Sequence, residues 1–464
     1  SSGMAMAHWE IQGWMILILG WVFVPFYSRS MVYTMPEFLE RRYNPQSRTI
    51  LSVISLVSYV LTKVAVTVYA GGLVFQQVFG IKELWGIDFF WIAAIGLVVL
   101  TALYTIFGGM KSVLYTSVLQ TPILLLGSLI ILVLGFKELG GWDEMMRVCG
   151  AVTVNDYGDT MTNLIRSNDD ANFPWLGALI GSAIIGFWYW CTDQFIVQRV
   201  LSGKNEMEAR RGTIFGAYLK LLPVFLFLIP GMIAFALHQK YIGAGGEGFL
   251  PMLANGTANA DAAFPTLVAK LLPAGVKGLV VCGILAALMS SLASLFNSSA
   301  MLFTIDFYKR FKPETPEKKL VGIGQIATIV IVVLGILWIP IMRSVGDVLY
   351  TYLQDVQSVL APGIAAAFLL GICWKRTSAQ GGMWGLISGM VIGLTRLGAK
   401  VYYSNAGEVA DSTFKYLFYD MNWLFFCGWM FLFCIIVVIV VSLATEAPTA
   451  EKIQGLVFGT ATKE

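Results

Sequence analysis

Charge is scarce in this chain. Only 13% of its 464 residues are Asp, Glu, Lys or Arg, and the formal net charge is +3. No block of five or six like charges forms a tail, so we expect no nucleic-acid partner. Histidine occurs only at His8 and His238, and no HExxH, GxSxG or P-loop motif is present. We therefore predict that the protein is not an enzyme.

Cysteine is also sparse, and its spacing suggests no chemistry. The six cysteines form no disulfide framework and no CxxC pair, and most lie inside apolar runs. They are Cys149, Cys191, Cys282, Cys373, Cys427 and Cys434. We interpret them as thiols packed among apolar neighbours, which say little about the cellular compartment.

Apolar residues are abundant instead, at 57% of the chain. They occur in runs of about 20 or more, the length that a helix rising about 1.5 Å per residue needs to cross a hydrocarbon core roughly 30 Å thick. A helix in the core of a water-soluble protein would be shorter and apolar along one stripe only. The composition therefore predicts an all-α integral membrane protein whose surroundings are the lipid bilayer.

We predict eleven membrane spans, at residues 11–29, 49–80, 89–109, 113–136, 173–199, 214–237, 274–305, 321–343, 347–373, 380–398 and 421–444. Arginine and lysine cluster in alternate connections, such as the first (Arg41, Arg42) and the fifth (Arg210, Arg211). The positive-inside rule places these connections in the cytoplasm. We therefore expect a multi-pass protein of the plasma or inner membrane, with the N-terminus of this chain outside and its C-terminus cytoplasmic.

Several polar side chains fall at membrane depth, where they are costly and mark candidate functional sites. Lys63 lies about 14 residues inside its span, too far for easy snorkelling, so we expect it to line a polar interior. Lys220 lies near the end of its span, and snorkelling to the interface is an equal alternative. Glu10 and Gln354 suit an outer or midplane polar pocket, although Glu10 fits a rim position equally well.

Residues 186–199, GFWYWCTDQFIVQR, place three consecutive aromatic rings near the predicted midplane. Tryptophan and tyrosine normally mark the membrane interfaces instead. Trp188, Tyr189 and Trp190 sweep about 200° of a helix, so at least one ring must face the protein interior. Aromatic rings beside polar groups suit a site for a sugar or another ring-shaped ligand. Plain packing between helices is the alternative.

The seventh predicted span is unusually rich in hydroxyl groups, in the run LMSSLASLFNSSAMLFTIDFY at 288–308. Small residues allow close packing of membrane helices, which is one explanation. A sodium site is the other, because hydroxyl and carbonyl oxygens hold a hard cation. Ser290 and Ser291, near the middle of the span, are the best candidates for such a site.

Five further runs carry a family resemblance when read with that serine-rich span. They are TALYTIFGGMKS (101–112), WYWCTDQFIVQR (188–199), YLKLLP (218–223), YLQ (352–354) and GICWKR (371–376). Together the runs resemble the sodium–glucose cotransporters of the sodium:solute symporter family, in the family's order and spacing. The resemblance covers nearly all of the eleven spans.

The resemblance implies a five-plus-five inverted-repeat bundle of about eleven transmembrane helices, with the first core helix absent from this chain. It places the rest of the first repeat in residues 1–136 and the second repeat in 173–373. Two peripheral helices follow in 374–444, and a cytoplasmic tail in 445–464. The implied activity is sodium-driven symport of a monosaccharide by alternating access.

The resemblance also implies site residues. Glu10, Trp190, Lys220 and Gln354 match the family's partners of sugar hydroxyls, Tyr189 matches the inner gate that stacks on the ring, and Lys63 matches a position near the sugar. Ser290 and Ser291, with the carbonyl of Ala287, match the sodium site. The implied ligands are therefore Na⁺ and a monosaccharide.

Two departures from the family's pattern affect the expected function. Ser117 stands where members with a second sodium carry an aspartate, so we predict one sodium per sugar. Gly186 stands where relatives carry a polar side chain that contacts the sugar, which leaves the preference at one hydroxyl open. A different polyol such as myo-inositol, a nucleoside, or an uncoupled sugar channel or sensor remain as alternatives.

Overall fold

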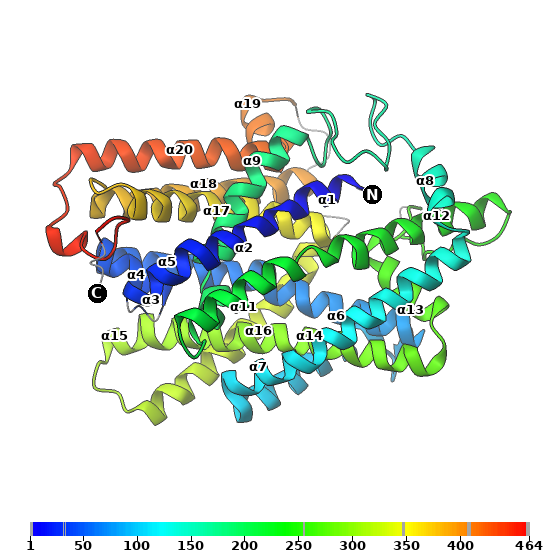
Figure 1. Cartoon of the computed structure of the whole chain (residues 1–464), viewed down its shortest axis with the longest axis horizontal. Coiled ribbons are helices and arrows are strands. Elements are labelled where there is room, and N and C mark those ends of the chain that lie inside the picture. The colour runs from blue at the N-terminus through cyan, green and yellow to red at the C-terminus, as the bar shows by residue number, and fades with distance from the viewer. Residues whose placement is uncertain are drawn as a thin grey trace. The chain divides into compact units, whose positions relative to one another are not determined.

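The computed structural model describes residues 3–30, 32, 34–253, 256–345, 349–405 and 410–460, most of them helical (Figure 1). The chain forms two compact units. Unit 1 comprises Ser1–Glu10, Lys63–Trp175 and Leu221–Asn297, and unit 2 comprises Ile11–Thr62, Leu176–Lys220 and Ser298–Glu464.

Unit 1 is built around long apolar helices. Its elements are α1 (Ala5–Glu10), α6 (Ala65–Phe79), β1 (Glu83–Leu84), β2 (Ile87–Asp88), α7 (Phe89–Leu139), α8 (Trp142–Gly150), η5 (Val224–Leu228), α12 (Ile229–Gly243), η6 (Ala260–Ala262), α13 (Ala263–Leu271) and most of α14 (Ala274–Met301). The two strands form one short antiparallel hairpin, in which Glu83 faces Asp88. Helix α12 packs against α7, α8 and α13, and buried residues such as Ile131, Ile233 and Leu267 form the core between them.

Unit 2 begins with a broken helix, and its last part contains four long helices among the described residues. Its first elements are η1 (Ile11–Gly13), α2 (Trp14–Ile18), η2 (Leu19–Phe23), α3 (Val24–Ser30), α4 (Met35–Arg42), α5 (Pro45–Ser58) and most of η3 (Tyr59–Val64). Next come α9 (Trp175–Gly186), η4 (Phe187–Thr192), α10 (Gln194–Leu201) and α11 (Glu206–Leu219). The last are η7 (Leu302–Tyr308), α15 (Lys309–Phe311), α16 (Glu317–Val345), α17 (Leu349–Cys373), α18 (Ala379–Asn405), α19 (Thr413–Lys415), η8 (Tyr416–Asp420), α20 (Trp423–Ala444) and η9 (Ala450–Lys452).

Helices α17, α18 and α20 pack side by side in unit 2 (Figure 1). Glycines make this close packing possible. A Cβ atom added to Gly363 of α17 would lie 2.9 Å from the Cα of Gly389 on α18. Gly381 and Gly385 of α18 lie against Val438 of α20 in the same way. Small residues at such crossings let membrane helices approach closely, which stabilises the bundle by van der Waals contact.

The helix starts in unit 2 follow ordinary capping rules. Thr34 accepts a hydrogen bond from the amide of Glu37 at the start of α4, and Asn44 accepts one from Ser47 at the start of α5. A proline stands in the first turn of each of these two helices, where no intrahelical donor is required.

All eleven predicted spans overlap helices, and residues 347 and 348, at the start of the ninth span, lie outside the described residues. Eight described helical segments are long and apolar enough to cross a membrane, and the bent pair Trp14–Ser30 and Met35–Arg42 could add a ninth. The other two predicted spans correspond to the apolar segment Phe89–Leu103 and to α18. Arg396 and Lys400 lower the apolar character of α18.

The expected connection between the third and fourth spans is wrong. We predicted a break near residues 110–112, but α7 runs without interruption from Phe89 to Leu139. The glycines of this region lower helix propensity by only about 1 kcal/mol each, and no proline occurs before Pro122. Glycine alone therefore does not end the helix.

Candidate functional site

The aromatic segment of the sequence forms a wide helical turn that ends at an acid. Residues 187–192 adopt the π-helical segment η4, and Asp193 leaves the helix with φ −78° and ψ 125°. The Asp193 carboxylate then accepts a hydrogen bond of 3.0 Å from the amide of Phe195 and caps α10. The span is therefore two helices joined at one capping residue.

Two neighbouring polar groups hold this junction in place. The hydroxyl of Tyr59 donates to Asp193 Oδ1 at 2.9 Å and accepts from the Phe195 amide at 3.1 Å. Gln194 Oε1 accepts from the amide of Met35, at the start of α4, at 2.8 Å. Asp193 and Gln194 therefore act as structural supports within unit 2.

Tyr189 and Trp190 lie directly before that junction, both half-buried on η4. Their ring centroids are 4.9 Å apart and their planes are almost perpendicular, an edge-to-face contact. The indole Nε1 of Trp190 is buried and has no hydrogen-bond partner. An unpaired buried donor costs about 1–3 kcal/mol, so this atom is a candidate ligand contact.

Gln354 has an unpaired buried acceptor, whereas Trp190 has an unpaired buried donor. Gln354 lies on α17, a helix that packs against η4. Its side chain is buried, and its Oε1 has no hydrogen-bond partner. Two residues earlier, the Tyr352 hydroxyl donates to the carbonyl of Leu61 at 3.0 Å and accepts from Trp338 Nε1 at 2.6 Å. This part of α17 is therefore anchored, while the amide oxygen of Gln354 remains available.

Lys220 follows the last residue of α11 and is half-buried. Its stem crosses Gly13 of η1, where an added Cβ would lie 3.0 Å from Lys220 Cγ. Helix α2, which follows η1, packs against both α11 and η4. Four candidates therefore lie in unit 2: Tyr189, Trp190, Lys220 and Gln354. Helix α17 contacts η4, and α2 contacts both η4 and α11.

The remaining candidates lie in unit 1. Lys63 is 7% exposed in the π-helical turn η3, which agrees with the buried position expected for it. Glu10 is the last residue of α1 and is partly exposed.

The sodium candidates share one face of α14, because Ala287, Ser290 and Ser291 stand at positions i, i+3 and i+4. Ser290 is buried, and its Oγ lies 2.6 Å from Oγ of Ser117 on α7. The residue that replaces the expected aspartate therefore touches a predicted sodium ligand. Hydroxyl oxygens in this arrangement suit a hard monovalent cation.

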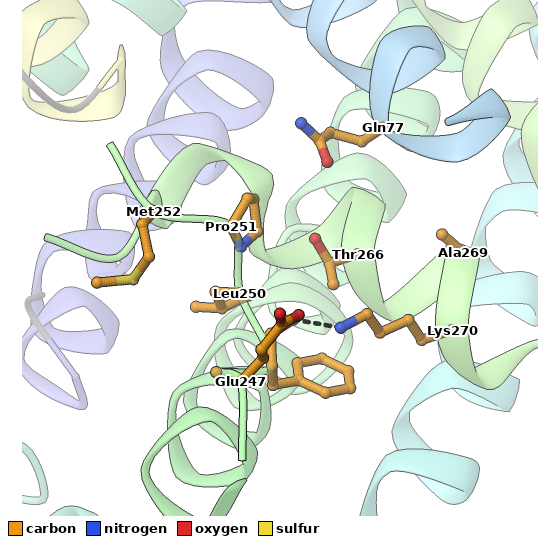
Figure 2. Close-up of a pocket in the computed structure, with 10 residues that line it drawn as sticks. Gln77, Glu247, Leu250, Pro251, Met252, Thr266, Ala269 and Lys270 are labelled. Atoms are coloured by element: carbon orange, nitrogen blue, oxygen red, sulfur yellow. Dashed lines mark hydrogen bonds between the residues drawn. The ribbon is translucent and has the colours of Figure 1, made fainter. Parts of the chain in front are cut away.

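A separate cavity of about 430 Å³ in unit 2 lies between α3, α4 and the segment at η9, and Arg29, Arg41 and Lys452 line it. Unit 1 has a cavity of about 530 Å³ beside the connection between α12 and α13 (Figure 2). There, Lys270 donates to the carbonyl of Phe249 at 2.8 Å, and the amide of Leu250 donates to Nδ1 of His238. None of the predicted substrate or sodium residues lines either cavity.

Comparison with known proteins agrees with the helical architecture. The model described as the sodium:solute symporter family matches residues 1–389. The chain belongs to the sodium:solute symporter family. Sodium is therefore the coupling ion, and the protein is a transporter rather than an enzyme.

Individual members of this family resemble the chain over almost its whole length. It is 35% identical to the sodium/myo-inositol cotransporter 2 of Homo sapiens over 99% of this chain and 69% of that protein. It is 37% identical to the sodium/mannose cotransporter SLC5A10 of Bos taurus over 96% of this chain and 76% of that protein. The sodium/glucose cotransporter 1 of Ovis aries is 37% identical over 93% of this chain and 67% of that protein.

A solved structure supports the fold. A Na⁺-coupled sialic acid symporter matches with a TM-score of 0.71 at 20% identity, over 96% of this chain and 86% of that one. Gly13, Tyr59 and Tyr352 also position the candidate residues, and the sequence did not predict this role for them. A glycine at a helix start and tyrosines inside apolar runs were the available signals, but neither identifies a partner.

Proposed function

We propose that this symporter carries a monosaccharide of the glucose or galactose type, together with one sodium ion, by alternating access. The observation that carries the proposal is that two of the candidate residues in unit 2 each have a buried side-chain atom without a hydrogen-bond partner. Trp190 Nε1 can only donate a hydrogen bond, and Gln354 Oε1 can only accept one. A hydroxyl group does both, so a polyhydroxylated substrate satisfies each atom with one kind of chemical group.

Further support comes from the chemistry of two other candidate residues in unit 2. The Tyr189 ring has an apolar face suited to the C–H face of a sugar ring, and the Lys220 ammonium group is a hydrogen-bond donor of the kind that sugar hydroxyl groups accept. Glu10 and Lys63 complete the set that the family resemblance assigns to the sugar. Ala287, Ser290 and Ser291 hold the sodium ion in this proposal.

The proposed topology follows from the distribution of basic residues. The N-terminus of this chain lies outside, the C-terminus lies in the cytoplasm, and sodium and sugar move inward. Residues 1–136 and 173–373 belong to the two repeats, 374–444 form peripheral helices and 445–464 form the tail. Inward movement of one positive charge through 100 mV supplies about 2.3 kcal/mol per cycle.

A second candidate substrate is a cyclic polyol. The similarity to a sodium/myo-inositol cotransporter favours it, and a ring of hydroxyl groups satisfies Trp190 and Gln354 as a monosaccharide does. Gly186 bears on the choice, because it leaves no polar side chain where relatives resembling this chain place one.

Uptake of labelled glucose, galactose, mannose and myo-inositol into proteoliposomes tests the substrate class. Trp190→Phe retains the ring and removes the donor, so we expect the KM of the preferred substrate to rise about fivefold to tenfold. Trp188→Phe, on the same turn, is the matched control and should change KM less than about twofold, because Trp188 Nε1 is not among the unsatisfied buried atoms. Equal KM values for Trp190→Phe and the unmodified protein would refute the assigned contact.

A further inference from the structure

Next to Gln354, α17 carries a buried acid that the proposed sugar contacts do not use. Asp355 is 7% exposed, and its Oδ2 lies 2.5 Å from Nζ of Lys400 on α18. Its other oxygen, Oδ1, lies 3.8 Å from Nη2 of Arg396, one turn earlier on α18. One carboxylate therefore faces two cations on the neighbouring helix.

Arg396 is fixed from several directions. Its guanidinium donates to the carbonyls of Met421 at 2.7 Å and Leu417 at 3.3 Å, and it lies 4.1 Å above the ring centre of Phe426. The side chain is fully buried. Arg396 thus ties α18 to η8 and α20, and Asp355 connects α17 to this rigid arrangement.

The helix geometry separates the roles of Gln354 and Asp355. Consecutive residues of an α-helix point about 100° apart, so Asp355 faces α18 while Gln354 projects in a different direction. The charged contact therefore restrains the rotation of α17 about its axis, together with the hydrogen bonds of Tyr352. A rotation of about 10° moves an atom roughly 6 Å from the axis by about 1 Å, which is enough to break a hydrogen bond.

Elsewhere along their contact, α17 and α18 approach each other closely at glycines. Gly363 of α17 and Gly389 of α18 meet backbone to backbone, without side chains to interlock. Gly393 lies against the carbonyl of Val359 in the same manner. Small residues permit this close approach of the two backbones, and the contact of Asp355 with Lys400 adds a directional restraint beside Gln354.

We propose that Asp355 is a positioning residue, which orients Gln354 toward the substrate by holding α17 against Lys400 and Arg396 of α18. The proposal rests on the proposed function, because it assumes that Gln354 contacts the substrate. Removing one partner of a buried ion pair also destabilises the fold, so the positional effect is measured as a change in substrate KM and not as a change in stability.

A double-mutant cycle tests the proposal through sodium-driven uptake of the preferred substrate, with reconstituted full chain. Asp355→Asn should raise the substrate KM about fivefold to tenfold, with little change in maximal rate or in the KM for sodium. In the Gln354→Ala background the same substitution should raise KM less than about twofold, because the group that it positions is gone. Asp355→Glu, which retains the carboxylate, should restore most of the lost affinity.

The outcomes separate this proposal from the proposed function. An unchanged KM in Gln354→Ala overturns both. A second outcome is that Gln354→Ala raises KM, and that Asp355→Asn raises KM by the same factor with and without Gln354→Ala. This outcome overturns only the positioning role. Asp306→Asn is the matched control, because Asp306 forms a buried pair of 2.5 Å with Arg48 on another helix, and its effect should add in full. If Asp355→Asn does not fold, Lys400→Gln at the partly exposed partner completes the same cycle with the same criteria.

Discussion

The hydroxyl group of Tyr59 bridges the two halves of a broken helix, donating to Asp193 Oδ1 at 2.9 Å and accepting from the Phe195 amide at 3.1 Å. Asp193 ends η4, which carries Tyr189 and Trp190, and caps α10. The position of the proposed gate is therefore coupled to the turn at η3, where Tyr59 is the first residue.

Tyr59→Phe should weaken this junction. The substitution removes a buried donor and acceptor together, so we expect the free energy of unfolding to fall by about 1–3 kcal/mol and the maximal transport rate to fall as well. Thermal unfolding and initial uptake rates measure the two effects. Tyr43→Phe also removes a buried hydroxyl group, which donates to Ala367 at 2.7 Å, and should lower stability without changing turnover. Equal rates for the two variants at matched protein amounts would contradict the coupling.

Gly186→Ala should disturb the packing of α9 against α2. The added Cβ would lie 3.0 Å from Cγ of Met15 and 3.4 Å from Cβ of Gln12. Overpacking of this kind costs about 1–3 kcal/mol, and shortening Met15 to Ala should recover part of it. Gly216→Ala is the control, since its Cβ meets open space within α11. If both alanine variants unfold at the same temperature, the glycine at 186 is not required for packing.

Ser117→Asp should change the sodium stoichiometry. The hydroxyl groups of Ser117 and Ser290 are 2.6 Å apart, so a carboxylate at 117 would place a negative charge beside the proposed sodium ligands. We expect a sodium Hill coefficient near one for the unmodified chain and a clear increase for Ser117→Asp, with Ser117→Asn as the uncharged control. A coefficient well above one in the unmodified chain would refute the single-sodium prediction.

Phe458 should stabilise unit 2 through a chain of aromatic contacts. Its ring lies 5.1 Å from Phe26 and 6.1 Å from Phe23, and Phe23 lies 5.6 Å from Phe187 at the start of η4. Edge-to-face contacts contribute about 0.5–1.5 kcal/mol each, so Phe458→Ala should lower the unfolding temperature by several degrees. Phe311→Ala removes a ring that is 80% exposed and should have little effect. Hydrogen exchange at residues 455–458 checks the local loosening, and unchanged protection would contradict the contact chain.

The sequence predicts the helices well because the length of an apolar run is a local property. Each of the eleven predicted spans falls on helical residues, including α18 despite Arg396 and Lys400. The breaks depend on tertiary contacts and are harder to predict. The break at Asp193 is supported by Tyr59, a residue 134 positions away in the sequence. The glycines before Pro122, in contrast, leave α7 unbroken.

The candidate site also combines features that follow from the local sequence with features that depend on tertiary contacts. Burial of Lys63 and the shared face of Ala287, Ser290 and Ser291 follow from depth and helical spacing. Other features depend on how side chains from different helices are placed, which the sequence does not show. They are the unpaired atoms of Trp190 and Gln354 and the position of the Lys220 stem across Gly13. Residue types and spacing carry no information about which of these polar atoms remains unpaired.

Sodium-driven accumulation of sugar tests the central claim most directly. Proteoliposomes with the reconstituted chain are given labelled glucose or galactose, with an inward sodium gradient or with equal sodium on both sides. We predict transient accumulation above the external concentration only with the gradient, and its loss in Ser290→Ala, which removes a proposed sodium ligand. Uptake that merely equilibrates at the same rate with and without the gradient would contradict coupled sugar transport and would instead indicate an uncoupled sugar pathway.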